Sequence, residues 1–207
     1  MTDPCAPGPG DRPRSYPVNL IVAGKRVLVV GGGAVAARKA AGLVAAGADV
    51  TVVAPEIHPD VEALPVTIER RAYRRGEAAG FRLAITATGD AQVNQAVFDD
   101  ADGAGVWVNA ADDPERCSFT LPAVVRRGPV LVTASTGGAS PALSSWLRER
   151  LDAQLGPELC ELATILAARR AEVKAQGRST EDVDWSPIIE SELSRLRGEH
   201  RPLRAVE

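Results

Sequence analysis

The stretch Val27-Leu28-Val29-Val30-Gly31-Gly32-Gly33-Ala34-Val35-Ala36 decides the fold. Its first four residues are apolar and three of them are β-branched, which predicts a short strand buried on both faces. The glycines end this strand, and the alanine-rich run from Ala34 to Ala46 has the composition of a helix. We therefore expect an α/β fold with a parallel sheet of the Rossmann type.

The glycines also have the spacing of a dinucleotide-binding turn. Gly31-x-Gly33-x-x-Ala36 fits the pattern G-x-G-x-x-G/A between a strand and a helix. Gly31 would allow the tight turn, Gly33 would let a pyrophosphate approach the backbone, and Ala36 would let helix and strand pack closely. The helix N-terminus would offer free N–H groups to the phosphates. A simpler interpretation is that the glycines only end a strand, but the flanking strand and helix favour the dinucleotide site.

Composition limits the class of protein. The chain has 207 residues, of which 45% are hydrophobic and 25% charged, as in ordinary soluble proteins, and its net charge of −3 argues against a nucleic-acid partner. The three cysteines (Cys5, Cys117, Cys160) lie far apart and only His58 and His200 are present, so we predict no metal site. No apolar run reaches the roughly 18 residues of a membrane span, and no signal-peptide core is present. We expect a cytoplasmic protein without a membrane partner.

The pattern along the chain divides into parts. Residues 1–13 are rich in Pro, Gly and Asp, and this composition predicts a disordered N-terminal segment. Residues 14–113 predict the dinucleotide-binding domain, with strands at 27–30, 49–53, 65–69, 83–87 and 106–108. The alternation changes in residues 114–150, where strands at 119–121 and 130–134 would flank 124–129, and a helix would begin at Ser140-Pro141. Residues 151–207 predict a small helical region.

The end of the second strand bears on the choice between NAD and NADP. Many NAD sites carry an acidic residue there that binds the ribose hydroxyls. Here Val53-Ala54-Pro55 occupies the place and Glu56 comes two positions later. Either Glu56 reaches the ribose or backbone groups near Pro55 do so. No arginine stands beside Ala54 to favour a 2′-phosphate, so we expect NAD.

Two later loops follow predicted strands at the edge where ligands of parallel sheets sit. Thr88 is therefore a candidate for the cofactor cleft, or else it helps to cap the helix predicted at 91–102. The loop from Asn109 to Pro114 leaves what we interpret as a central strand. Such residues often form simple turns, but here Asp112 or Asp113 could face a substrate beside the nicotinamide. The small residues from Ser135 to Ser140 either close over a ligand or form a flexible connector.

Five blocks together resemble the precorrin-2 dehydrogenase and sirohydrochlorin ferrochelatase family, which comprises the N-terminal half of siroheme synthase and stand-alone relatives. The resemblance covers about residues 16–155. The blocks that carry it are Gly31 to Lys39, Ala87 to Asn94, Val108 to Asp112, Ser118 to Ala123 and Ser135 to Leu143.

The resemblance implies NAD-dependent oxidation of precorrin-2 to sirohydrochlorin, toward siroheme and in some organisms cobalamin. It implies a homodimer with a dimerisation segment at 114–150. Ala34 and Val35 match the dinucleotide-contacting turn, and Pro55 and Glu56 match the ribose-side contact. Asp112 falls where the catalytic aspartate of the family stands, so we expect it to be the general base.

Several expectations stay open at this stage. Some family members also insert ferrous iron into sirohydrochlorin, and the sequence does not decide whether iron is a second substrate here. Thr136 occupies the place of a serine that is phosphorylated in the bacterial fusion enzyme. A rival interpretation is an NAD-sensing regulatory domain without turnover, which would not need the 109–112 loop. The substrate bears eight carboxylates and requires positive charge; the candidates are Arg116, Arg126, Arg127, Arg148, Arg150 and the run from Arg70 to Arg75, which otherwise forms a solvated surface.

Overall fold

The computed structural model describes residues 15–111 and 113–198. The boundary between two compact units falls between Leu121 and Pro122, and each unit is described by itself. The disordered N-terminal segment predicted for residues 1–13 lies outside the described residues. The finer division into 14–113, 114–150 and 151–207 stays a prediction.

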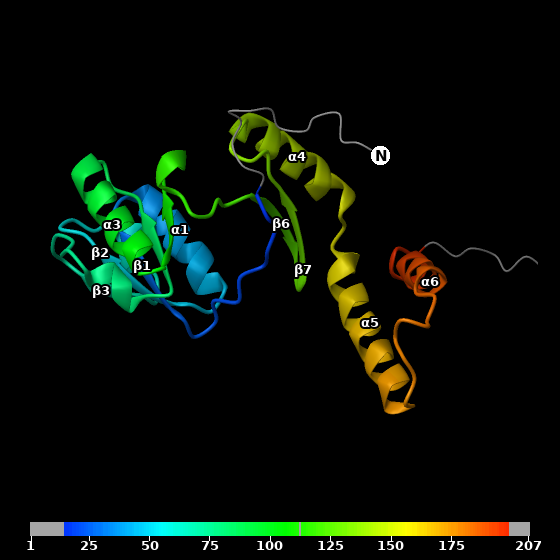
Figure 1. Ribbon diagram of the computed structural model, residues 1–207. Helices are drawn as coiled ribbons and strands as arrows, with labels where there is room; N and C mark the ends of the chain where they lie inside the picture. The colour runs from blue at the N-terminus through cyan, green and yellow to red at the C-terminus, as the bar shows by residue number, and fades with distance from the viewer. Residues whose placement is uncertain (1–14, 112, 199–207) are drawn as a thin grey trace, which may run out of the picture. The chain divides into compact units, whose positions relative to one another are not determined.

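The first unit is built on a parallel five-stranded sheet with the strand order β3-β2-β1-β4-β5 (Figure 1). Helices α1 and α3 make the crossovers from β1 to β2 and from β4 to β5. This arrangement confirms the predicted α/β fold of the Rossmann type. The elements are β1 (Arg26–Val30), α1 (Ala34–Ala45), β2 (Asp49–Val53), α2 (Pro59–Glu62), β3 (Thr67–Glu69), the 3-10 helix η1 (Glu77–Gly80), β4 (Leu83–Thr86), α3 (Ala91–Gly103), β5 (Trp107–Ala110) and the 3-10 helix η2 (Pro114–Arg116).

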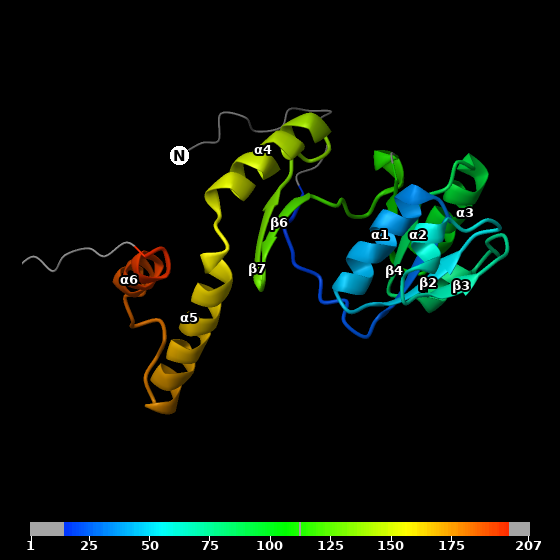
Figure 2. The same ribbon diagram turned by 180° about the vertical axis from the view of Figure 1, so that it is seen from behind.

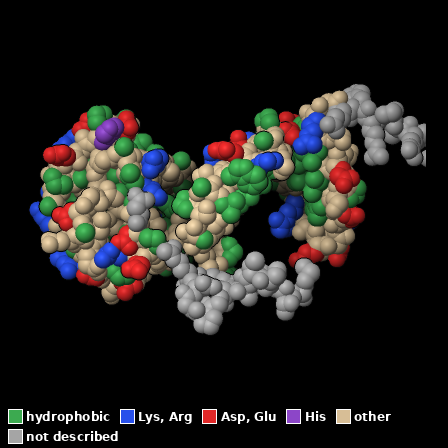
Figure 3. All heavy atoms as spheres, turned by 90° about the horizontal axis from the view of Figure 1, so that it is seen from above, with side chains coloured by type: hydrophobic (Ala, Val, Ile, Leu, Met, Phe, Trp, Pro, Cys, Tyr) green, Lys and Arg blue, Asp and Glu red, His purple; other side chains and the backbone are tan. Residues whose placement is uncertain are grey.

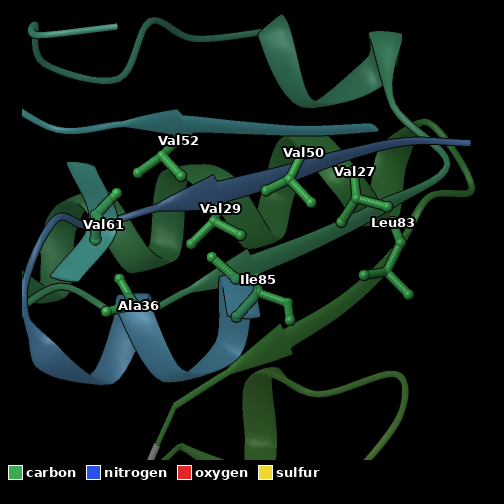
Figure 4. Close-up of a cluster of buried hydrophobic side chains, with 10 residues drawn as sticks. Val27, Val29, Ala36, Val50, Val52, Val61, Leu83 and Ile85 are labelled. Atoms are coloured by element: carbon green, nitrogen blue, oxygen red, sulfur yellow. The ribbon is translucent and has the colours of Figure 1, made fainter. Parts of the chain in front are cut away.

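Small aliphatic side chains fill both faces of this sheet, because alternate residues of each strand point to opposite sides. One face packs against α1 and α2, and its side chains converge in Figure 4. The other face packs against α3 and η1. The first set includes Val27, Val29, Val50, Val52, Leu83 and Ile85 with Ala36, Ala40 and Val61, and the second includes Leu28, Val30, Ala84 and Val108 with Ala78, Val97 and Ala101.

The chain crosses from β3 to β4 through a segment that polar contacts tie to α3. The Tyr73 hydroxyl donates to Asp100 Oδ2 at 2.7 Å, and the Gly76 N–H donates to the same oxygen at 2.6 Å. Burial raises the pKa of Tyr73, and its bond to Asp100 raises it further. Burial alone would raise the pKa of Asp100, but the bonds from Gly76 and Tyr73 outweigh it and lower that pKa. After this crossover β4 pairs with the side of β1 opposite to β2, so the strand order reverses between β1 and β4, which is where ligands bind in such sheets.

The described residues of the second unit, 122–198, form a hairpin and three helices (Figure 2). Strands β6 (Ala123–Arg127) and β7 (Val130–Ala134) pair antiparallel, and α4 (Pro141–Gln154) packs on them. Helix α4 begins as predicted, since the Ser140 Oγ accepts from the Leu143 N–H at 3.2 Å. Helices α5 (Glu158–Ala175) and α6 (Ser186–Leu196) pack together and confirm the predicted helical pattern.

The prediction of a strand at 119–121 was wrong. The strand that pairs with β7 runs through 123–127, and Gly128, with φ +56°, forms the turn between them. Residues 117–119 instead lie along the outer side of β5. There the Ser118 N–H donates to the Val108 carbonyl at 2.8 Å.

Candidate functional site

The register of the sheet brings the loops that carry the predicted cofactor-binding residues to one edge. The last residues of neighbouring strands lie in one row, in the order Glu69, Val53, Val30, Thr86 and Ala110. The hydrogen-bonded ladder continues one residue further, with Gly31 donating to Val53, Ala87 to Val30 and Ala111 to Thr86 at 2.8–3.0 Å. The loops that begin at Gly31, Ala54, Ala87 and Ala111 therefore leave the sheet side by side.

The three glycines after β1 serve different purposes. Gly31 has φ +123°, and a Cβ on it would lie 2.3 Å from the Ala87 carbonyl oxygen, so it lets the loops after β1 and β4 approach each other. A Cβ on Gly32 would lie 1.9 Å from the Glu56 carbonyl oxygen. A Cβ on Gly33 would meet nothing within 4 Å. The role of Gly32 was missed because the G-x-G-x-x-G/A pattern skips this position.

We expect Gly32→Ala to lower the free energy of unfolding by about 1–3 kcal/mol, because the new methyl group overlaps backbone that is itself held in place. The Gly32 carbonyl accepts from the His58 N–H at 2.8 Å, which fixes the facing segment. Gly33→Ala adds the same methyl group in open space and should cost at most about 1 kcal/mol. Urea unfolding of both variants measures the difference. Equal stabilities would contradict the close contact between Gly32 and the loop after β2.

The N-terminus of α1 fits a pyrophosphate. Its N-cap is Gly33, which has no side chain to bond the first N–H groups, and its first turn carries no acidic residue. Gly33 and Ala34 are exposed and Val35 is half-buried. Free N–H groups together with the helix dipole favour an anion at this position. Gly33 has no side chain and the space beside its Cα is open, so a phosphate can approach the backbone closely.

The segment after β2 lies beside the glycine turn. Pro55 and Glu56 are exposed, while the Glu56 carbonyl faces Gly32. The Glu56 carboxylate makes no hydrogen bond or ion pair with the rest of the described chain. These two residues therefore lie where a group bound at the glycines would meet them.

The loop after β4 is held by one side chain of α3. The Thr88 hydroxyl donates to Asn94 Oδ1 at 3.0 Å, and Asn94 Nδ2 donates to the Thr88 carbonyl at 3.1 Å. The fully buried Thr86 hydroxyl bonds to the same Asn94 oxygen. The cap of α3 is Asp90, whose carboxylate accepts from two backbone N–H groups of the first turn. Thr88 supports this cap, since its hydroxyl accepts from the Asp90 N–H at 3.1 Å.

Strand β5 lies at the edge of the described sheet, so our interpretation of it as a central strand was wrong. The outer side of β5 is covered by the returning chain instead of another strand. Asn109 pairs with Cys117 in an antiparallel bridge, and Asn109 Nδ2 donates to the Phe119 carbonyl at 2.9 Å. The loop after β5 still leaves the same edge of the sheet as the glycine turn.

The thiol of Cys117 closes this loop. Its Sγ accepts from the Ala110 N–H at 3.3 Å and can donate to the Asp113 carbonyl at 3.2 Å. Burial raises the pKa of the Cys117 thiol, which keeps it protonated. Asp112 lies outside the described residues, and its chain neighbours Ala111 and Asp113 are both half-buried at this edge.

Most of the predicted substrate arginines are already paired within the chain. Among the described residues, Arg74 and Arg126 make no hydrogen bond or ion pair through their side chains. The pairs are Arg70 with Glu62, Arg71 with Glu69 and Glu77, Arg75 with Asp99 and Asp100, Arg116 with Asp113, Arg127 with Asp152 and Arg148 with Glu149. Arg150 lies over the Trp146 ring, with its Cζ 4.6 Å from the ring centroid.

The described part of the chain contains no cluster of metal-ligating side chains and no membrane-spanning helix. No three His, Cys, Asp or Glu side chains gather there closely enough to hold a metal ion. His58 has a structural role, because its Nδ1 accepts from the Asp60 N–H at 3.2 Å and caps α2. None of the described helices has the length and apolar character needed to cross a bilayer.

Comparison with known proteins adds to this geometry. Residues 18–123 match the family described as "Putative NAD(P)-binding". The siroheme synthase of Nitrosococcus oceani is 36% identical over 184 residues, which cover 86% of this chain and 39% of that protein. The siroheme synthase of Chromobacterium violaceum is 37% identical over 201 residues, which cover 92% of this chain and 42% of that protein. The chain thus spans less than half the length of these curated relatives.

A solved structure shows the same fold. The protein described as "SirC, precorrin-2 dehydrogenase" superposes with a TM-score of 0.68 at 24% sequence identity. The match covers 89% of this chain and 100% of that one. The resemblance to siroheme synthases that the sequence motifs predicted is confirmed by the matches to the relatives above.

Proposed function

The chain belongs to the family described as "Putative NAD(P)-binding", and on that premise we propose that it is an oxidoreductase that converts precorrin-2 to sirohydrochlorin in siroheme biosynthesis. The observation that carries the proposal is the single edge of the sheet at which the glycine turn and the loop containing Asp112 both leave. The siroheme synthases among the relatives and the precorrin-2 dehydrogenase with the same fold support this substrate.

We propose NAD as the cofactor, held by groups that the first unit presents at this edge. The backbone at Gly31, Gly33, Ala34 and Val35 would bind the pyrophosphate, and the exposed Pro55 and Glu56 would meet the adenosine ribose. A free Glu56 carboxylate suits ribose hydroxyls and would repel the 2′-phosphate of NADP. When bound, the nicotinamide accepts the hydride that the substrate loses. Thr88 would line the cleft at that end.

Asp112 is the proposed general base. Oxidation of precorrin-2 removes a hydride and a proton, and the proton requires an acceptor beside the reacting carbon. The Asp112 carboxylate would take it from the loop after β5. Of the arginines predicted for the substrate carboxylates, we propose Arg74 and Arg126 as candidates, since both are exposed and neither side chain is paired within the described chain.

No observation specifically favours iron insertion or an NAD-sensing domain. Insertion of ferrous iron, with iron as a second substrate, follows from the resemblance alone, and the described residues supply no ligand cluster for it. A sensing domain without turnover would not need a loop closed by the side chains of Cys117 and Asn109. We therefore propose the dehydrogenase.

One assay separates the dehydrogenase from the sensor. Precorrin-2 is generated enzymatically, NAD is added, and the absorbance of sirohydrochlorin is followed, with NADP in a parallel reaction. The dehydrogenase produces the sirohydrochlorin spectrum, faster with NAD than with NADP. An unchanged spectrum in a sample with demonstrated NAD binding would favour the sensor.

We further propose that the protein is a homodimer that associates through the second unit. Val124, Leu143 and Trp146 are 42%, 47% and 50% exposed, and hydrophobic side chains lie open on the surface of this part of the chain (Figure 3). All residues of α4 are described and none is buried, although the helix packs on the hairpin, so part of its apolar surface stays uncovered within the described chain. We expect Trp146→Glu to weaken association at least about tenfold in sedimentation experiments. Thr164→Glu, at an exposed site of α5, is the control, and a monomeric wild type would contradict the proposal.

A further inference from the structure

A line of polar contacts connects α3 with the loop that contains Asp112. Arg116 Nε donates to Gln95 Oε1 at 2.6 Å, and Arg116 Nη1 pairs with the Asp113 carboxylate. Gln95 Nε2 in turn donates to Asp99 Oδ1 at 2.6 Å. A carboxylate can only accept, so Asp99 fixes the orientation of the Gln95 amide and turns its oxygen toward Arg116.

In these contacts the Arg116 guanidinium binds other side chains of the same protein. Its side chain is 33% exposed and that of Asp113 is 28% exposed, so both charges are partly withdrawn from water and each needs the other. The Nε and Nη1 groups of Arg116 are thus both engaged within the protein, on Gln95 and on Asp113. Arg116 was among the arginines predicted to bind the substrate carboxylates, and the contacts of the described chain point to a second role, in holding Asp113.

Helix α3 holds both loops of the site through adjacent residues. Asn94 bonds the loop after β4 at Thr88, and Gln95 bonds the loop after β5 through Arg116. The backbone of the loop after β5 is held by the Ala111 N–H on Thr86, by the Asp113 N–H on Ala110, and by the Cys117 thiol and the Arg116 N–H on the Asp113 carbonyl. Arg116 is the partner that the described chain supplies for the Asp113 side chain. The pair of Gln95 and Arg116 adds a contact at Asp113, which follows Asp112 directly in the chain.

We propose that Gln95 and Arg116 are positioning residues: they hold Asp113 at the edge of the sheet and thereby restrain the residue that precedes it in the chain, Asp112. The inference rests on the proposed function only in giving Asp112 the role of base. We call the pair of Gln95 and Arg116 the clamp. A base displaced by a fraction of an ångström lowers the rate without lowering substrate affinity, so the clamp is expected to affect kcat.

Gln95→Leu, Arg116→Leu and the double variant test this in the full-length protein, with Gln92→Leu as the matched control, because Gln92 is an exposed glutamine on the first turn of the same helix. We expect kcat for precorrin-2 oxidation to fall roughly tenfold in each single variant, with KM for precorrin-2 and NAD unchanged. The double variant should be no slower than Arg116→Leu, since both act through one contact. Arg116→Lys keeps a charge for Asp113 and should lose less than Arg116→Leu.

A substrate-binding Arg116 gives a different result. It raises KM for precorrin-2, and its effect adds to that of Gln95→Leu; either outcome would overturn the proposal. Hydrogen exchange of the peptide spanning residues 109–117 provides a readout without turnover. Exchange should be faster in Gln95→Leu and Arg116→Leu than in wild type and in Gln92→Leu. Unchanged exchange overturns the clamp, and a wild type that exchanges slowly but does not oxidise precorrin-2 contradicts the proposed function alone.

Discussion

Replacing Asp112 by Asn lowers kcat for precorrin-2 oxidation by about 100- to 10,000-fold, the range in which general-base catalysis contributes to rate. The amide has nearly the shape of the carboxylate but does not accept a proton at neutral pH. The affinity for NAD should stay the same, because the proposed cofactor contacts lie on the glycine turn and on the loop after β2. Absorbance of sirohydrochlorin measures the rate, and titration of NAD against protein fluorescence measures the affinity.

A matched control is Asp102→Asn, which removes the same charge from an exposed position near the end of α3. It should leave both quantities at the wild-type level, so that a fall in kcat cannot be assigned to net charge. Wild-type turnover in Asp112→Asn would remove this carboxylate from the mechanism. A parallel loss of NAD affinity would instead assign Asp112 to cofactor binding.

Local sequence predicts the strands of the first unit well because each is a nearly continuous apolar run. Strands buried on both faces of a parallel sheet contain few polar residues, so 27–30 and 49–53 could be placed within a residue of β1 and β2. The order of those strands depends on pairing across the chain, which no short motif records. For this reason β5 was interpreted as central although it lies at the edge.

The errors at the site have the same physical origin. The return of the chain along β5 is fixed by Ser118 and Asn109, whose partners lie about ten residues away in sequence. A local pattern does not record such partners, so the composition of 119–121 alone was interpreted as a strand. The arginine run gave no sign of its partners, since Arg75 pairs with Asp100, 25 residues further on. Glycine spacing, in contrast, is a local property, and it correctly predicted the turn between β1 and α1.

Replacing Gly33 by Asp lowers the affinity for NAD by about 100-fold, while the protein remains folded. The structure leaves room for the new side chain, because a Cβ at Gly33 meets nothing within 4 Å. An aspartate at this N-cap also bonds the first N–H groups of α1, the groups that the proposed pyrophosphate site requires. Its carboxylate then repels the phosphates from the position they would occupy, and a few kcal/mol of lost binding corresponds to that fold-change.

Gly42→Asp provides the comparison that isolates the charge at the helix N-terminus. Gly42 lies in the same helix, and a Cβ on it likewise meets nothing within 4 Å. Its distance from the first turn leaves the N–H groups of Ala34 and Val35 free, so NAD should bind Gly42→Asp as it binds the wild type. If Gly33→Asp also bound NAD with wild-type affinity while its unfolding midpoint stayed normal, the pyrophosphate would have to bind away from the start of α1, because a phosphate and an aspartate cannot both occupy those N–H groups.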